Sequence, residues 1–125
     1  MTGGLVRAAT IVRHRWSDIP AEAITPSIGR QFIAAERVTL ARFQLKQGGV
    51  VPRHAHEQEQ LSYVLEGALT FVVNGQDVLV SAGEVVQIPS WTEHEVRVVE
   101  DTLVIDVFSP VRQDWIDKTD TYFLK

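Results

Sequence analysis

The amino-acid sequence predicts an all-β protein, built as a sandwich or barrel of short strands. Stretches rich in β-branched and aromatic residues recur about every ten residues, with glycine, proline or asparagine between them. The dipeptide Asn74-Gly75 stands between two alternating stretches and is the strongest short signal for a β-hairpin. Regular spacing of many short strands favours a sandwich or barrel over a fold of alternating strands and helices.

Turn residues bound each expected strand. Residues 38–45 alternate in polarity and end at two glycines and a proline, and a second strand ends at Gly67. Ser109 and Pro110 are typical of a helix N-cap and first turn, so one or two helical turns are expected directly after them. The remaining expected elements are strands at 60–67, 84–89, 93–99 and 102–110, a hairpin over 68–83 and a helical turn over 111–116.

Length and composition indicate one domain and exclude several partners. A chain of 125 residues suits a single domain, with an arm and edge strands over 1–37, the barrel over 38–110 and a tail over 111–125. A net charge of −4 without a basic run argues against nucleic-acid binding. The absence of cysteine, of a long apolar run and of a signal peptide predicts a soluble cytoplasmic protein with no membrane partner.

Two of the four histidines, His54 and His56, are one residue apart. Side chains at positions i and i+2 of a strand point to the same face, so both imidazoles can reach one ion. If the strand continues regularly, Gln58 and Gln60 share that face, whereas Glu57 and the second glutamate of this stretch lie on the other. Alternation therefore favours a glutamine as a further ligand without deciding between the two.

A third histidine, His94, follows the stretch "GEVVQIPSWTE". A neighbouring strand can return it to the interior that the histidine pair faces. The fourth, His14, lies outside both stretches and is expected at the surface.

The stretch "GGVVPRHAHEQEQLSYVLEG" resembles the first signature motif of the cupin superfamily. Gly48 precedes His54 by the spacing of that motif, His56 follows, and Gly67 ends it. Gln60 stands where a glutamate is usual, so the resemblance selects Gln60 as the further ligand.

The stretch "GEVVQIPSWTEH" resembles the second cupin motif, with Gly83, Pro89 and His94 at the matching positions. Trp91 replaces the usual glycine after the proline, and Val98 replaces the usual final asparagine. Neither position supplies a metal ligand, so these departures bear on the shape of the pocket.

The resemblance implies a small single-domain cupin, that is, a jelly-roll β-barrel with a short C-terminal helical turn, usually a homodimer with one divalent metal inside. The neutral amide of Gln60 leaves the ion its full charge, which makes it a stronger Lewis acid toward an oxygen ligand. Nitrogen and oxygen donors without sulfur suit Mn, Fe, Co, Ni or Zn. The implied ligands are His54, His56, Gln60 and His94.

A second group of residues lies near the C-terminal end, in "VIDVFSPVR". Asp106 and Phe108 share one face of a strand that Asp106 interrupts with a charge, and Arg112 follows Pro110. One interpretation is a structural salt bridge between Asp106 and Arg112. The other is a general acid/base beside the metal, with Arg112 binding a substrate carboxylate and Phe108 forming a pocket wall.

The whole chain is similar to small pectin-degradation cupins, which convert 4,5-unsaturated uronates to linear keto-sugars. This resemblance implies catalytic roles for Asp106 and Arg112, and contacts of a small anionic substrate with Phe108 and Trp91. Two alternatives remain: an Fe-dependent dioxygenase, and a non-enzymatic cupin that binds a small molecule. Arg30 is expected at the surface or in a subunit contact.

Overall fold

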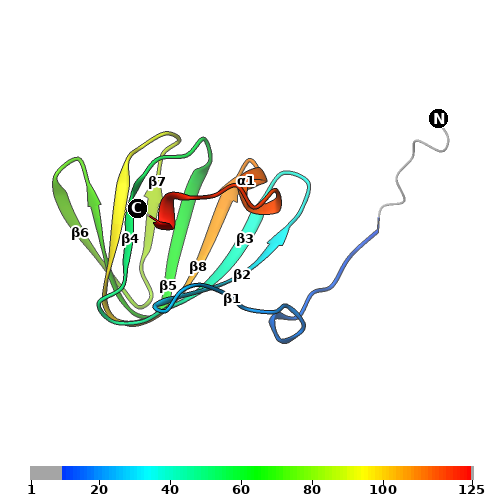
Figure 1. Ribbon diagram of the computed structural model, residues 1–125, viewed down its shortest axis with the longest axis horizontal. Helices are drawn as coiled ribbons and strands as arrows, with labels where there is room; N and C mark the ends of the chain where they lie inside the picture. The colour runs from blue at the N-terminus through cyan, green and yellow to red at the C-terminus, as the bar shows by residue number, and fades with distance from the viewer. Residues whose placement is uncertain (1–9, 125) are drawn as a thin grey trace.

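The computed structural model describes residues 10–124 and confirms an all-β barrel with a short helical turn near its C-terminal end (Figure 1). All strand pairs are antiparallel. The strands are β1 (Glu22–Thr25), β2 (Ile28–Ala34), β3 (Thr39–Leu45), β4 (Val50–His54), β5 (Glu59–Val73), β6 (Gln76–Ser81), β7 (Val85–Ile88) and β8 (His94–Ser109). The helical elements are the 3-10 turn η2 (Trp16–Asp18), the α-helix α1 (Gln113–Ile116) and the 3-10 turn η3 (Tyr122–Leu124).

The two long strands β5 and β8 hold the barrel together. They pair with each other, and the sheet order is β1-β2-β3-β8-β5-β6, with β4 on β8 and β7 on β5. The sequence predicts a break at Gly67, but β5 continues through it, with register shifts against β8 on either side. Gly67 has φ +89, a conformation that glycine adopts readily, and this lets the strand bend without ending.

The hairpin turn predicted at Asn74-Gly75 is confirmed, whereas the helix start predicted at Ser109 is not. Asn74 and Gly75 connect β5 to β6 with φ values of 51 and 75, as a type I′ hairpin turn requires. The predicted helix start at Ser109 and Pro110 is wrong, because β8 extends to Ser109 and α1 begins only at Gln113. The residue that precedes the helix is Arg112, three positions after the serine that the sequence predicts as the cap.

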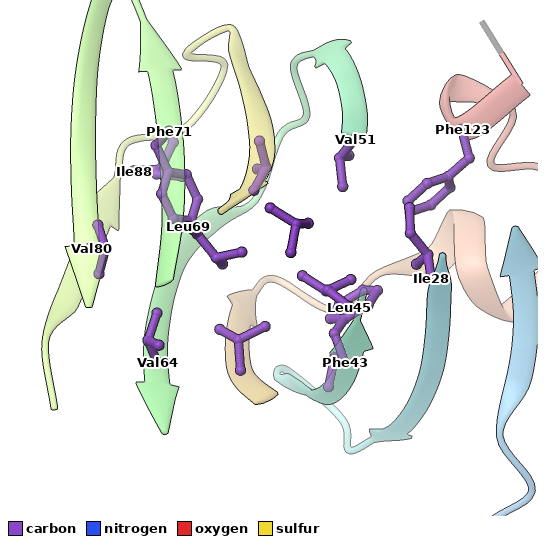
Figure 2. Close-up of a cluster of buried hydrophobic side chains, with 14 of the residues drawn as sticks. Ile28, Phe43, Leu45, Val51, Val64, Leu69, Phe71, Val80, Ile88 and Phe123 are labelled. Atoms are coloured by element: carbon purple, nitrogen blue, oxygen red, sulfur yellow. The ribbon is translucent and has the colours of Figure 1, made fainter. Parts of the chain in front are cut away.

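Alternation along the strands separates the core from the solvent. Figure 2 shows apolar side chains from several strands meeting inside the barrel, with Leu69 and Phe71 of β5 among the most deeply buried. Full burial of side chains of this size stabilises the fold by roughly 1.5–3 kcal/mol each. Beyond these, the inward faces of β5 and β8 carry polar residues, namely Gln60, Ser62, His94 and Asp106. The apolar core thus supports a polar site within the same barrel.

The segment before β1 leaves the barrel. Figure 1 shows it running away from the strands, and its residues Ile11 and Val12 are 97% and 63% exposed. Within residues 10–124, no helix is long and apolar enough to cross a membrane. The division of the chain into arm, barrel and tail, the homodimer and the cytoplasmic location stay predictions.

Candidate metal centre and active site

Three histidines meet at one end of the barrel interior. His54 ends β4 and pairs in register with His94, the first residue of β8, while His56 lies in the connection from β4 to β5. One ring nitrogen from each lies within 4.8 Å of the other two. His56 and His94 are 9% and 1% exposed, so water covers little of the cluster.

The outer nitrogen of each ring is held by the backbone. Nδ1 of His54 lies 2.7 Å from the carbonyl oxygen of Pro52, that of His56 lies 3.0 Å from Gln58, and that of His94 lies 2.8 Å from Thr92. A carbonyl only accepts, so each Nδ1 carries the proton and donates it. The Nε2 atom of each neutral ring is left with a free lone pair for a metal.

Burial keeps these rings neutral. It lowers the pKa of His54 to about 3, with the neighbouring His94 adding to the effect. Burial and then the charge of Arg112 lower the pKa of His56 to about 4, and burial also lowers that of His94. All three imidazoles are therefore in the ligand form at neutral pH.

The Gln60 amide faces this cluster from β5. Its Oε1 lies 3.0 Å from Nε2 of His56, and its Nε2 donates to Ser62 Oγ at 2.9 Å. The Gln60 oxygen and the His56 nitrogen are both acceptors here, because the other nitrogen of His56 already carries the ring proton. Two lone pairs at this distance repel each other unless a cation lies between or beside them.

The other candidates of the same stretch are directed elsewhere. Gln58 is buried, but its Nε2 donates to the backbone oxygen of Val111 at 3.0 Å. Glu57 and Glu59 are exposed, as strand alternation predicts. The part of the chain between His54 and Glu59 is a turn, so the alternation is interrupted there and resumes in β5.

The residues present fit a divalent cation. Three imidazole nitrogens and a nearby amide oxygen are the donors that first-row divalent metals accept, and no sulfur is among them. The lone pairs of His56 Nε2 and Gln60 Oε1 face each other with no proton between them, and a cation would stabilise this arrangement. The identity of the metal does not follow from these donors.

Asp106 lies in the same cavity, opposite Ser62 on the neighbouring strand. Burial raises its pKa to about 7, against a hydrogen bond from the Ser62 hydroxyl and the charge of Arg112. Its Oδ1 has no hydrogen-bond partner among residues 10–124. A carboxyl group with one unpaired oxygen and a pKa near neutrality can both accept and release a proton.

Arg112 also lines the cavity, but it does not pair with Asp106. Its Nε and Nη2 donate to the carboxylate of Asp114 at 2.9 and 2.8 Å, and Nη2 also reaches the Tyr122 hydroxyl at 3.3 Å. The guanidinium lies 4.8 Å from the ring centre of Phe108 and 4.3 Å from that of Trp115. Within the described chain Nη1 makes no hydrogen bond, so one donor is free for a ligand.

The cavity itself is small. His54, Gln60, His94, Asp106 and Arg112 line it together with apolar core residues, and its volume is about 40 Å³. A water molecule occupies about 30 Å³ in the liquid, and ligand pockets are typically about 300–1,000 Å³. In this conformation the site has room for an ion and a water-sized ligand.

Comparison with known proteins identifies the family. Residues 41–108, more than half of the chain, match the family model described as the cupin domain. The chain belongs to the cupin family. An uncharacterized protein of Streptomyces coelicolor is 27% identical to this cupin over 81 residues, which are 64% of this chain and 77% of that protein.

Solved cupin structures superpose over most of the chain. KdgF from a Halomonas species has a TM-score of 0.74 and 29% identity over 79% of this cupin and 94% of that chain. An RmlC-like cupin from Shewanella frigidimarina gives 0.78 and 25% identity over 85% and 96% of the two chains. The polyketide cyclase RemF from Streptomyces resistomycificus gives 0.70 and 26% over 81% and 80%.

Two predicted positions lie outside the cavity of this cupin. The Trp91 side chain is 67% exposed and is not among the residues that line the cavity, although its backbone N–H donates to the His56 oxygen at 2.8 Å. Its contact with substrate stays a prediction. His14 is exposed and does not belong to the metal cluster, as expected.

The C-terminal residues of the cupin close the site, which the sequence did not predict. The Tyr122 ring stacks on His54 at 4.2 Å between ring centres, and Phe123 lines the same cavity. Asp120 anchors this segment through an ion pair with Arg30 at 3.0 Å. The expectation of Arg30 at the surface is wrong: its side chain is 3% exposed, because its guanidinium packs on Trp115 at 4.3 Å.

Proposed function

We propose that this cupin is a mononuclear-metal enzyme that converts a 4,5-unsaturated uronate to a linear keto-uronate. The observation that carries the proposal is the single cavity that joins the histidine cluster to the unpaired Oδ1 of Asp106 and the free Nη1 of Arg112. The resemblance of the whole chain to pectin-degradation cupins supports this substrate class. KdgF from a Halomonas species is a structural neighbour of this cupin at 29% identity.

His54, His56, His94 and Gln60 would hold the ion. When bound, a divalent metal would polarise the substrate oxygens that face it. Arg112 would orient the substrate carboxylate through its free Nη1, with Phe108 as the wall beside it. These roles leave Asp106 as the group that moves protons.

Asp106 would act first as an acid and then as a base. In its protonated form it delivers a proton to one carbon of the double bond. As the carboxylate it then takes a proton from the water that adds to the other carbon, which restores its starting state. The hydrated product is a hemiketal, and opening of its ring gives the linear keto-uronate. A pKa of about 7 lets both forms exist at neutral pH.

A uronate ring needs more space than the cavity offers, so we propose that residues 120–124 withdraw when substrate enters. The Arg30–Asp120 ion pair and the stacking of Tyr122 on His54 are the contacts that would open. The Tyr122 hydroxyl now lies near Arg112, where a substrate carboxylate would take its place.

The test is the loss of ultraviolet absorbance when the metal-loaded protein is mixed with unsaturated galacturonate. We expect turnover that needs a divalent metal and falls at least about a hundredfold in Asp106→Ala. Asp77→Asn, an exposed carboxylate on β6, is the matched control and should retain full activity. Wild-type turnover in Asp106→Ala, or none in any metal-loaded protein, refutes the proposal, and oxygen consumption instead would indicate a dioxygenase.

We propose further that the cupin is a homodimer joined through the segment before β1. Ile11 and Val12 are apolar and exposed on that segment, which a second copy would cover. Light scattering during gel filtration should give twice the mass of one chain for the wild-type protein. The substitution Ile11→Asp should shift the measured mass toward that of one chain. A monomeric wild-type protein contradicts this part.

A further inference from the structure

The Ser62 side chain connects the histidine cluster to Asp106. Ser62 is 1% exposed and lies on β5, two residues after Gln60 and in register with Asp106 on β8. Its oxygen accepts from Gln60 Nε2 at 2.9 Å, and its hydroxyl faces the Asp106 carboxyl group across the strand pair, where it favours the charged form of that group. A line of polar side chains therefore runs from Gln60 through Ser62 to Asp106.

The direction of these bonds is set by chemistry. The amide nitrogen of Gln60 only donates, so the Ser62 oxygen must accept from it. The single hydroxyl proton of Ser62 is then free for the Asp106 carboxylate, which only accepts when ionised. With the Ser62 oxygen accepting from the Gln60 amide nitrogen, the amide oxygen of Gln60 is the atom that faces His56.

The opposite orientation of the Gln60 amide would remove the ligand. Turned by half a rotation, the amide would present N–H donors to the histidines, and N–H groups repel a cation. The Ser62 proton would then be drawn to the amide oxygen and away from Asp106, whose Oδ1 has no hydrogen-bond partner within the described chain. Leaving the buried carboxyl group without the Ser62 hydroxyl disfavours the turned amide.

We propose that Ser62 is a positioning residue that fixes the amide oxygen of Gln60 toward the metal. This inference rests on the proposed metal centre, and it adds a residue that neither the motif spacing nor the histidine cluster indicates. Ser62 does not touch the ion; it acts through Gln60, as outer hydrogen-bond partners commonly act on metal ligands.

The test is titration of the metal-free protein with Co²⁺, followed by calorimetry and by the visible absorption bands of the bound ion. We expect Ser62→Ala to bind Co²⁺ about ten- to a hundredfold more weakly than wild type. Ser62→Thr keeps the hydroxyl and should restore the affinity. Ser81→Ala, which removes a hydroxyl from β6, is the control and should bind like wild type.

The Gln60→Ala background separates this inference from the proposed centre. If Ser62 acts through Gln60, Ser62→Ala should cause no further loss once Gln60 is alanine. An equal loss in both backgrounds, a Ser62→Ala protein that binds like wild type, or no recovery in Ser62→Thr would overturn the role of Ser62. Unchanged Co²⁺ affinity in Gln60→Ala alone would instead refute the proposed fourth ligand. Thermal unfolding of each metal-free variant verifies that it is folded.

Discussion

Asp106 gives the sharpest prediction for stability, because burial disfavours its charge at neutral pH. The substitution Asp106→Asn keeps the shape of the side chain and removes the ionisation. Burial raises the pKa of this carboxyl group from 3.8 to about 7. Between these two pH values the folded state holds the proton of Asp106 more tightly than the unfolded state, so the contribution of this one group to stability falls as pH rises through this window and then levels.

The size of the effect follows from the shift. A change of about three pKa units is worth about 4 kcal/mol at 1.36 kcal/mol per unit, and this full cost is reached above about pH 7. At pH 5 the unfolded carboxyl group is only about one unit past its own pKa, so the cost there is about 1–2 kcal/mol. The advantage of Asp106→Asn over wild type should therefore grow by about 2–3 kcal/mol from pH 5 to pH 8.

Urea unfolding of the metal-free proteins at both pH values measures this difference. The hydrogen bonds of the new amide contribute equally at both, so they cancel. The histidines, whose pKa values burial lowers, are common to both proteins and cancel as well. Asp77→Asn, on the exposed face of β6, should show no growth with pH. A gap between Asp106→Asn and wild type that is the same at pH 5 and pH 8 would refute a buried carboxyl group with a raised pKa.

Three further outcomes are expected. In denaturant titration, Gly67→Ala should lower the free energy of unfolding by more than about 3 kcal/mol, because the new methyl group would overlap the Asp101 carbonyl at φ +89. The control Gly75→Ala places its methyl group in open space and should lower it by about 1 kcal/mol. Measured by calorimetry, the Co²⁺ affinity should fall less than about tenfold from pH 7 to pH 5, because a histidine such as His54 stays neutral at both pH values. If the three histidines had ordinary pKa values, the affinity would fall about ten-thousandfold over the same range. Asp120→Asn should speed Co²⁺ uptake in stopped flow by loosening the C-terminal segment, and unchanged uptake would contradict that access route.

Local sequence patterns predicted the strands of the barrel and one side of the site. Alternation placed Gln60 on an inward face and Glu59 outside, because β5 is regular from Glu59 to Val64. Glu57 is also exposed, but it lies before β5, where the alternation is interrupted. The same alternation, continued by two residues, reaches Ser62, so the signal for this residue was present in the sequence. The position of Ser62 beside Asp106 depends on the pairing of β5 with β8, which local alternation does not report.

Contacts between distant segments could not be predicted in this way. The partner of Arg112 is Asp114, two residues away, where the sequence suggested Asp106 on the preceding strand. The choice depends on how the chain turns after Ser109, and no periodicity reports that turn. The closure of the site by Tyr122 depends likewise on the path of the tail, which the Arg30–Asp120 pair fixes across 90 positions of the sequence.

The tryptophan between the two buried arginines gives the protein an optical reporter of its own. Trp115 is 2% exposed, lies 4.3 Å from the guanidinium groups of both Arg30 and Arg112, and donates to the Tyr122 hydroxyl. Withdrawal of the C-terminal segment would remove that hydrogen bond and admit water to the indole. The emission of Trp115 should then shift to longer wavelength, while that of Trp91, already in solvent, stays constant. Because the third tryptophan, Trp16, is half-buried, the double variant Trp16→Phe and Trp91→Phe is needed to leave Trp115 as the one tryptophan. A shift of its emission then reports opening of the site without substrate or label.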